Sequence, residues 1–232
     1  MANSKRDVHV VFLGPTGCGK SRLCNFLLED DKAFKVNASF QSVTKGIESK
    51  WKSINTNNEL IAFKFIDTQG LADTTMTNAE VVSTVAAAVK QDIQYVNYFV
   101  IILRAGRLTD ENRNALEDII KAFKLSDDER KKHAFLLLSH CECSNQQLRD
   151  QYEKECLADR TLKKLLIVRS NRAINFQCIG LPQPSEVNEW MYEGIMKWMN
   201  VQRKGLLEYL SKPIEGIRPT NDGFFENICT IL

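Results

Sequence analysis

Eight consecutive residues near the N-terminus have the composition and spacing of a phosphate-binding loop. They are Gly14, Pro15, Thr16, Gly17, Cys18, Gly19, Lys20 and Ser21, and they satisfy the pattern G-x-x-x-x-G-K-[ST]. Glycines let backbone N–H groups surround a phosphate, and the start of a following helix adds its positive dipole. We expect Lys20 to bridge the β- and γ-phosphates of a nucleotide and the Ser21 hydroxyl to bind Mg²⁺, with Arg22 completing the nucleotide-binding group. The alternative is a glycine-rich turn that binds nothing.

Two later segments carry groups that could complete such a site. Asp67 follows an apolar run that ends at Ile66, and a carboxylate at that point can hold Mg²⁺ through water. The amide of Gly70 can hydrogen-bond a γ-phosphate and so sense its hydrolysis. Thr44 lies between the loop helix and a predicted hairpin, where it can close over Mg²⁺ and the γ-phosphate as a first switch. The order and spacing of these groups favour a nucleotide switch more strongly than any one of them alone.

The elements that must position these residues follow from hydrophobic periodicity. Apolar runs predict buried strands at 8–13, 60–66, 99–103 and 134–138, with a weakly alternating strand at 47–54 and a hairpin turn at 56–58. Helical spacing predicts helices at 21–28, 80–95, 110–123, 146–157 and about 186–210. Strands that alternate with helices predict an α/β fold with a mostly parallel central sheet, helices on both faces and a C-terminal helix.

Composition narrows the class of protein. The 232 residues are 44 % hydrophobic, which is enough for a sizeable core. The net charge is only +2, which argues against a nucleic-acid-binding protein. Seven cysteines are an odd number, so they cannot form a fully paired disulfide framework, and reduced thiols in the cytoplasm or nucleus are expected. No apolar run approaches the roughly 20 residues of a membrane-spanning helix, and no signal peptide is expected.

The last four residues fit a lipidation frame. Cys229, Thr230, Ile231 and Leu232 match the C-a-a-X prenylation pattern, in which a final Leu favours a geranylgeranyl group. Cys229 is therefore a candidate lipidation site. The expected location is the cytoplasm, with peripheral attachment to the cytosolic face of a membrane if the lipid is added. The alternative is a hydrophobic terminus without a lipid.

The chain resembles the immunity-associated nucleotide-binding GTPases, the GIMAP/IAN group with an AIG-type G domain, from about Val8 to Trp198. That group is related to septins and to chloroplast outer-envelope import receptor GTPases. The resemblance rests on the phosphate loop and on segments 42–45, 67–70, 106–111 and 171–176. It implies a P-loop NTPase G domain over residues 1–200, followed by a C-terminal helix end and tail over 201–232. It also implies that Arg172 and Phe176 belong to a late loop that binds the base.

The segment after the apolar run at 134–138 departs from the Asn-Lys-x-Asp motif common in G domains. It reads Ser139, His140, Cys141, Glu142. By position, Glu142 would accept hydrogen bonds from guanine N1 and N2; adenine has no N1 proton and no N2 amine. His140 could stack on the base. Two alternatives stay open: Glu142 as a solvated loop carboxylate, and residues 140–143 as a metal cluster, which would lack a distant ligand pair with zinc-like spacing.

Hydrolysis needs a group that orients water and a group that stabilises charge. Leu71 stands where Ras-like enzymes carry a catalytic Gln, and Gln69 lies inside the motif instead, so intrinsic hydrolysis is expected to be slow. The resemblance implies dimerisation across the nucleotide face, with some members supplying an arginine in trans. Arg107 is the first candidate for that arginine and Arg104 the second. The catalytic candidates are therefore Thr44, Gln69 and Arg107, and Arg107 has the alternative role of an ion-pair partner.

Two other functions compete with a GTP-dependent switch. An ATP-dependent kinase can use the same phosphate loop, but such kinases generally carry an arginine-rich lid, and none is evident in this sequence. A scaffold that holds nucleotide without hydrolysing it is compatible with Leu71. Measured turnover separates a scaffold from a GTPase, and nucleotide preference separates a kinase from both.

Overall fold

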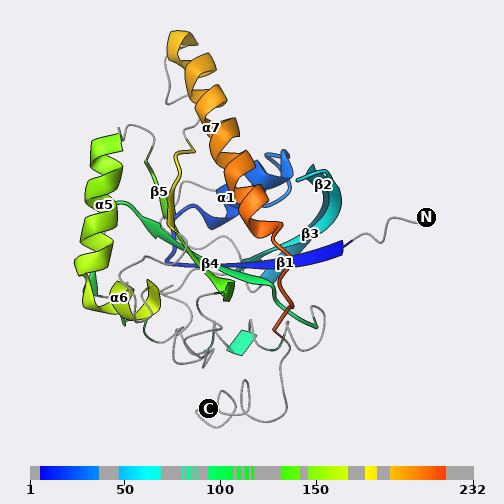
Figure 1. The fold of residues 1–232 in the computed structure, drawn as a ribbon, viewed down its shortest axis with the longest axis horizontal. Helices are drawn as coiled ribbons and strands as arrows, with labels where there is room; N and C mark the ends of the chain where they lie inside the picture. The colour runs from blue at the N-terminus through cyan, green and yellow to red at the C-terminus, as the bar shows by residue number, and fades with distance from the viewer. Residues whose placement is uncertain are drawn as a thin grey trace.

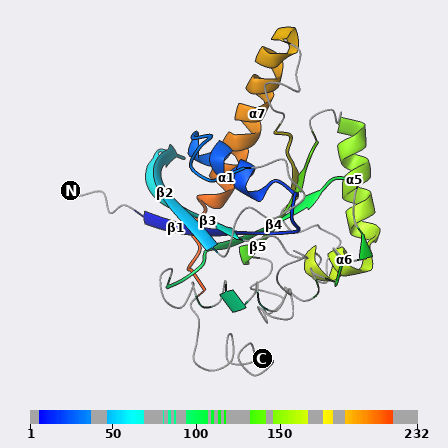
Figure 2. The same cartoon turned by 180° about the vertical axis from the view of Figure 1, so that it is seen from behind.

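The computed structural model describes all five predicted strands and the helix after the phosphate loop. The described residues are 6–36, 47–68, 80, 83–84, 87, 94–106, 109–110, 113–114, 117, 132–141, 146–166, 176–181 and 189–217. Figure 1 shows one twisted sheet with α1 (Lys20–Leu28) and α7 (Glu189–Leu210) on one side, and α5 (Gln146–Ala158) and α6 (Arg160–Leu166) at one end. Figure 2 shows the same arrangement from behind.

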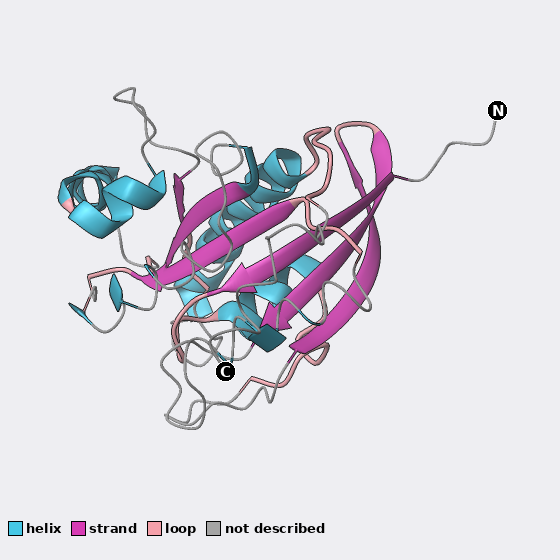
Figure 3. Cartoon of the chain, turned by 90° about the horizontal axis from the view of Figure 1, so that it is seen from below, coloured by secondary structure: helices cyan, strands magenta, loops and turns pink. Residues whose placement is uncertain are grey.

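The sheet is mostly parallel, as predicted. Its strand order is β2-β3-β1-β4-β5-β6, and only β2 runs antiparallel to its neighbour. The strands are β1 (Arg6–Leu13), β2 (Ile47–Thr56), β3 (Glu59–Thr68), β4 (Tyr98–Arg104), β5 (Ala134–Ser139) and β6 (Phe176–Cys178). Seen from below, the strands lie side by side and twist across the molecule (Figure 3). The parallel strands therefore direct their carboxyl ends, and the residues that follow them, to one edge of the sheet.

The predicted hairpin between β2 and β3 turns at Asn57 and Asn58. Both residues have positive φ, 51° and 60°, and Thr56 pairs with Glu59 across the turn. A two-residue loop with positive φ at both positions matches the right-handed twist of the strands, and asparagine tolerates that conformation well. The hairpin prediction is confirmed.

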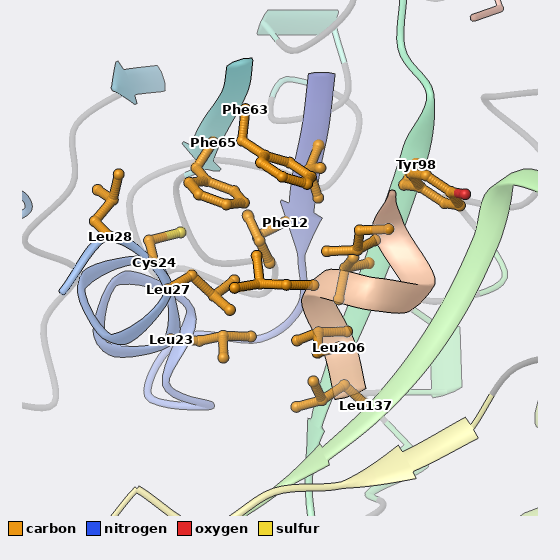
Figure 4. Packing of buried hydrophobic residues seen from close by; sticks show 14 of the residues in the cluster. Phe12, Leu23, Cys24, Leu27, Leu28, Phe63, Phe65, Tyr98, Leu137 and Leu206 are labelled. Atoms are coloured by element: carbon orange, nitrogen blue, oxygen red, sulfur yellow. The ribbon is translucent and has the colours of Figure 1, made fainter. Parts of the chain in front are cut away.

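The main core lies between the sheet and the helices α1 and α7. Phe12, Phe63, Phe65 and Leu137 point from the sheet, and Leu23 and Leu27 of α1 meet them with Leu206 of α7 (Figure 4). All seven side chains are buried. Burying a large apolar side chain contributes about 1.5–3 kcal/mol. This packing holds α1, and with it the loop that precedes α1, against the middle of the sheet.

Polar contacts anchor the C-terminal end of α7. Arg6 at the start of β1 forms an ion pair with Glu59 and donates hydrogen bonds to the carbonyls of Ser211 and Lys212. Asn57 in the hairpin donates to the Ser211 hydroxyl at 2.8 Å. A cationic side chain at a helix C-terminus satisfies carbonyls that have no partner within the helix. The end of α7 is thus fixed to β1 and to the β2–β3 hairpin.

The structure corrects one helix boundary and adds two elements. The helix expected over 80–95 ends before Gln94, because Gln94 has φ 66° and neither it nor Tyr95 is helical. Tyr95 instead stacks on His9, with ring centroids 4.3 Å apart. The short helix α6 and the short strand β6 were not predicted from the sequence. Within the described ranges, no helix has the length and hydrophobicity to cross a bilayer.

Candidate nucleotide-binding site

The phosphate loop connects the buried strand β1 to helix α1. Gly14 is needed where the loop leaves the strand, since a Cβ atom there would lie 2.2 Å from the carbonyl oxygen of Ile102 in β4. Gly19 has φ 93°, in the left-handed region that favours glycine. A side chain at Gly14 would therefore clash with β4, and a side chain at Gly19 would strain the backbone.

The N-terminus of α1 has the properties of an anion site. Its N-cap residue Gly19 makes no side-chain hydrogen bond to the helix, and the first turn carries no acidic residue. Within the part of the chain that the structure describes, the buried Oγ1 of Thr16 has no hydrogen-bond partner. The first N–H groups of a helix need an acceptor, and the dipole favours a negative charge. These groups fit a nucleotide phosphate.

Lys20 supplies a buried positive charge to this loop. Its ammonium donates hydrogen bonds to the carbonyls of Gly14 and Pro15, each at 3.0 Å, and the residue is 6 % exposed. A buried ammonium needs partners, and the two loop carbonyls account for two of its three donors. The ammonium is thus held inside the loop, where a phosphate bound to the loop would meet it.

Ser21 and Asp67 form the candidate Mg²⁺ site. The parallel register pairs Phe12 with Asp67, which places this carboxylate at the end of β3 beside the loop. The Ser21 hydroxyl donates to Oδ2 of Asp67 at 2.5 Å, and Asp67 is fully buried. Thr68 ties the two strand ends together by donating to the Phe12 carbonyl at 2.7 Å. A hydroxyl and a carboxylate are oxygen ligands of the kind that Mg²⁺ prefers, so the two residues fit the expected metal.

Ser139 is a positioning residue that the sequence reasoning missed. It ends β5, and its hydroxyl donates to the carbonyl of Cys18 in the phosphate loop at 2.7 Å. The same hydroxyl lies 3.2 Å from the Leu103 carbonyl and 2.9 Å from Nδ1 of His140. Ser139 therefore links the phosphate loop to the segment expected to read the base. Its position at the end of a predicted strand, directly before His140, was the available signal.

His140 leaves the sheet in a left-handed conformation, with φ 60°, and is exposed. The contact with Ser139 orients its ring. Cys141 follows as a buried residue, and its N–H donates to the Ile179 carbonyl at 3.1 Å. Phe176 begins β6, next to β5 in the sheet. Phe176 pairs with Leu136, before the end of β5, whereas His140 follows the end of β5. The two expected base-binding residues therefore lie on neighbouring strands but at different levels along the sheet.

Cys18 is buried inside the phosphate loop. Burial raises the pKa of its thiol, and the nearby Lys20 lowers that pKa only in part. The neutral thiol is not the reactive form of cysteine, so oxidation of Cys18 should be slow. This favours Cys18 as a small packing residue of the loop over a fast redox sensor.

Several predicted site residues lie outside the described residues. They are Thr44, Gln69, Gly70, Leu71, Arg107, Glu142, Arg172 and Cys229. Arg104, the second candidate for a catalytic arginine, ends β4 and is exposed. Among the residues that the structure describes, which include His140 and Cys141 but not Glu142 or Cys143, no three metal-ligating side chains come together.

The helix predicted over 110–123 begins where the sequence places it. Asp110 is its first helical residue, and the N–H of Arg113 donates to the Thr109 carbonyl at 3.0 Å. Arg113 also pairs with Asp110 at 2.6 Å and with Asp159 at 2.8 Å. Asp159 in turn accepts hydrogen bonds from the N–H groups of Thr161 and Leu162 at the start of α6. The helix that follows the candidate Arg107 is thereby fastened to α6.

Strand β1, the phosphate loop and helix α1 follow one another directly, and Ser21 hydrogen-bonds Asp67 at the end of the neighbouring strand β3. This is the arrangement of a P-loop nucleotide site. The AIG1 family matches residues 8–189, which is most of the chain. The chain belongs to the AIG1 family. The resemblance to AIG-type G domains drawn from the motifs is confirmed.

Solved structures share the fold at low sequence identity. Toc33 from Arabidopsis thaliana, in complex with Mg²⁺ and GMPPNP, is 15 % identical with a TM-score of 0.64, over 93 % of this chain and 89 % of that one. Toc33 in complex with GDP and Mg²⁺ is also 15 % identical, with a TM-score of 0.64, over 92 % and 88 % of the two chains. An Era variant from Aquifex aeolicus, bound to GDP and AlF4⁻, is 17 % identical with a TM-score of 0.58, over 90 % and 58 %. The predicted α/β fold is confirmed.

Proposed function

We propose that this AIG1-family protein binds GTP and GDP with Mg²⁺, hydrolyses GTP slowly, and acts as a switch or scaffold by dimerising or oligomerising in a nucleotide-dependent way. The observation that carries the proposal is the contact between Ser21 and Asp67, 2.5 Å long, beside a helix N-terminus with no side-chain cap. This arrangement offers oxygen ligands for a metal and N–H donors for phosphate at one point. When bound, Mg²⁺ would neutralise charge on the β- and γ-phosphates.

The chain's own residues have separable roles in this proposal. The phosphate loop binds and orients the phosphates through backbone N–H groups, and Lys20 adds a fixed positive charge beside them. Thr44 and Gly70 close on the γ-phosphate, so they sense whether it is present. Glu142 selects guanine, while His140 and Phe176 flank the base. Ser139 keeps the base segment in register with the phosphate loop.

Hydrolysis is proposed to depend on a second copy of the chain. Leu71 offers no hydrogen bond to the attacking water, so the monomer is expected to be slow, with Gln69 the remaining candidate in the motif. Dimerisation is important for the GTPase activity of Toc33, a protein with the same fold. In this chain Arg107 is the candidate to reach the partner's nucleotide, and an arginine supplied in trans can raise the rate by about 10³ or more.

Location is a separate part of the proposal. Free thiols and the absence of a strong net charge are consistent with a cytoplasmic protein that binds no nucleic acid. The C-terminal frame at Cys229 would add a lipid and hold the protein on the cytosolic face of a membrane. Changing Cys229→Ser should then release it from membranes in cells that carry out prenylation. A wild-type protein that is already fully soluble in those cells would contradict this part.

The decisive experiment is a titration of the purified chain with GTP, GDP, a non-hydrolysable GTP analogue and ATP. Lys20→Ala should abolish detectable binding of all of them, while Lys35→Ala, which removes an exposed lysine near the end of α1, should leave binding unchanged. Glu142→Ala should reduce the preference for guanine over adenine. Tighter binding of ATP than of GTP would contradict the proposal and favour the kinase alternative.

Turnover measured against protein concentration tests the dimer. The rate per chain should rise with concentration, and Arg107→Ala should remove that rise while nucleotide binding stays intact. A rate that is flat across concentrations would contradict catalysis by a second copy. Binding without any turnover at all would favour the scaffold alternative.

A further inference from the structure

Two cysteines come together beside the base-binding end of the sheet. Cys178 lies in β6, in register with Leu138 of β5, and Cys141 follows the end of β5. The Cys141 N–H donates to the carbonyl of Ile179, the residue after Cys178. This backbone hydrogen bond is 3.1 Å long and joins Cys141 to the residue next to Cys178. The two cysteines therefore lie on adjacent, hydrogen-bonded segments of the chain.

The side chains are also in contact. The Cys178 thiol makes a hydrogen bond with the Cys141 thiol, and this contact, together with burial, raises the pKa of Cys178 strongly. The Cys141 sulfur lies 3.5 Å from the Leu138 carbonyl and 3.7 Å from the Ser139 carbonyl. Both cysteines are buried, and neither has a role in the nucleotide chemistry proposed above.

A third cysteine provides an internal comparison. Cys156 of α5 is buried in the same region, and burial followed by the nearby Glu155 and Asp159 raises its pKa to about 12. The charge of Cys141 is the last of the causes that raise the pKa of Cys156, whereas the hydrogen bond with Cys141 is the largest cause for Cys178. Cys156 therefore shares the environment of the pair but is less strongly coupled to Cys141.

We propose that Cys141 and Cys178 form a reversible disulfide that ties the end of β5 to β6 and slows the release of bound nucleotide. His140 lies directly before Cys141, and Phe176 lies two residues before Cys178. A covalent bond between the two segments restrains the separation that lets a base leave. The effect on release depends on the function proposed above, whereas formation of the bond does not.

The oxidant that balances the reaction is a peroxide. One thiolate attacks hydrogen peroxide, becomes a sulfenic acid and releases water after protonation. The second thiol displaces that hydroxyl group as a second water and forms the S–S bond. Overall, two thiols lose two protons and two electrons, and one peroxide is reduced to two waters. A dithiol reductant reverses the reaction.

The contact between the two thiols and their burial set the rate of this reaction. The thiolate is the reactive form, and the hydrogen bond with Cys141, followed by burial, raises the pKa of Cys178 and keeps it protonated at neutral pH. Oxidation should therefore be slow at neutral pH and faster at higher pH. The pair would respond to sustained oxidation rather than to a brief pulse.

The test uses the full chain loaded with fluorescently labelled GDP and treated with hydrogen peroxide. Mass measurement after alkylation and proteolysis should show one cross-linked peptide pair, containing Cys141 and Cys178, with the loss of two hydrogen atoms. Labelled GDP should leave the oxidised protein several-fold more slowly, and a dithiol reductant should restore the original rate. Cys156→Ser is the matched control and should behave as the wild type.

Cys178→Ser and Cys178→Ala should both prevent the cross-link and the slower release. Two substitutions are used in case one of them disturbs folding. A variant counts as folded when its release rate under reducing conditions matches that of the reduced wild type. The proposal is overturned if no cross-link forms, if Cys156 replaces Cys178 in it, or if release is unchanged once it forms. A protein that forms the disulfide but binds no guanine nucleotide contradicts the proposed function and the effect on release, not the thiol pair.

Discussion

The phosphate end and the base end of the candidate site are built differently. The phosphate end is one continuous segment, from Gly14 to Ser21, with Asp67 brought beside it by a parallel strand pair. The expected base end combines His140 after β5 with Phe176 at the start of β6, and these residues lie far apart in the sequence. Ser139 connects the two ends through the carbonyl of Cys18.

This difference reflects two kinds of recognition: backbone groups can bind phosphate, whereas side chains must recognise the base. Phosphate is bound mainly by N–H groups and a helix dipole, so the loop needs small residues and a fixed path more than specific side chains. A base is recognised by the donor and acceptor pattern of its edge, which requires side chains held at defined positions. Substitutions in the phosphate loop should therefore weaken the binding of all nucleotides equally. Substitutions at the base end should alter the selectivity for guanine or the rate of nucleotide release.

The largest effect is expected from Gly14→Ala. The new Cβ would lie 2.2 Å from the Ile102 carbonyl oxygen, a backbone atom that cannot move aside without shifting β4. We expect the loop to be displaced, binding of all nucleotides to be lost, and stability to fall by about 1–3 kcal/mol or more, as for other overpacked sites. Nucleotide titration and urea unfolding measure the two effects.

Gly194→Ala is the matched control for that substitution. Gly194 lies within α7, and a Cβ there meets no atom within 4 Å. Alanine favours a helix over glycine by about 0.5–1 kcal/mol, so this variant should be as stable as the wild type or slightly more stable. Normal binding by Gly14→Ala would show that the loop does not depend on this close approach.

The second effect concerns the metal. Asp67→Asn removes the charge from the carboxylate that contacts Ser21, and it should weaken the dependence of GTP binding on Mg²⁺. A residue that holds a metal through water typically contributes about 10–100-fold to metal affinity. GTP affinity measured with Mg²⁺ and with a chelator should differ less in the variant than in the wild type. Asp31→Asn, which changes an exposed aspartate beyond α1, should leave the difference intact.

The arrangement of the candidate phosphate end could be predicted because its information is local. The loop motif, the strand before it and the helix after it are continuous in the sequence. The neighbouring strands are recognisable as runs of apolar residues. Asp67 could be placed because the carboxyl ends of parallel strands share one edge of a sheet. The Asn57–Asn58 turn was equally clear, since few residues favour positive φ at both positions.

The base end was harder to predict because its contacts join distant residues. β6 has only three residues, and nothing in their periodicity distinguishes them from a loop. The contact between Cys141 and Cys178 depends on the pairing of β5 with β6, which local sequence does not specify. The end of the helix before Gln94 depends on a left-handed residue, and neither glycine nor proline marks it.

Ser139→Ala tests the link between the two ends. The substitution leaves the buried carbonyl of Cys18 without this hydrogen bond and removes the contact that orients His140. Losing one partner of a buried hydrogen bond costs about 1–3 kcal/mol, so nucleotide affinity should fall by about tenfold or more. Guanine preference should also fall, because the base segment loses its register with the loop. Ser53→Ala, on the exposed part of β2, is the control and should change neither quantity.

The smallest effect is expected at the far end of α1, where Glu29 contacts Lys52 at 3.1 Å and Arg203 at 2.8 Å. The hydrogen bond from Lys52 lowers the pKa of Glu29. A lowered pKa means that the carboxylate stabilises the fold above its ordinary pKa, and that this contribution is lost as pH falls through the lowered value. Because the side chain is 58 % exposed, water screens the pair, and Glu29→Gln should cost only about 0.2–1 kcal/mol at neutral pH.

Urea unfolding of wild type and Glu29→Gln at pH 7 and at about pH 3 measures this difference, which should be smaller at the second pH than at the first. Glu208→Gln is the control, since its pair with Lys204 is 3.8 Å long and exposed, and it should show little difference at either pH. Nucleotide affinity should stay the same in both variants, because the phosphate loop is held by the packing of α1 on the sheet. A loss of affinity in Glu29→Gln alone would show instead that the phosphate end, like the base end, depends on side chains from distant parts of the chain.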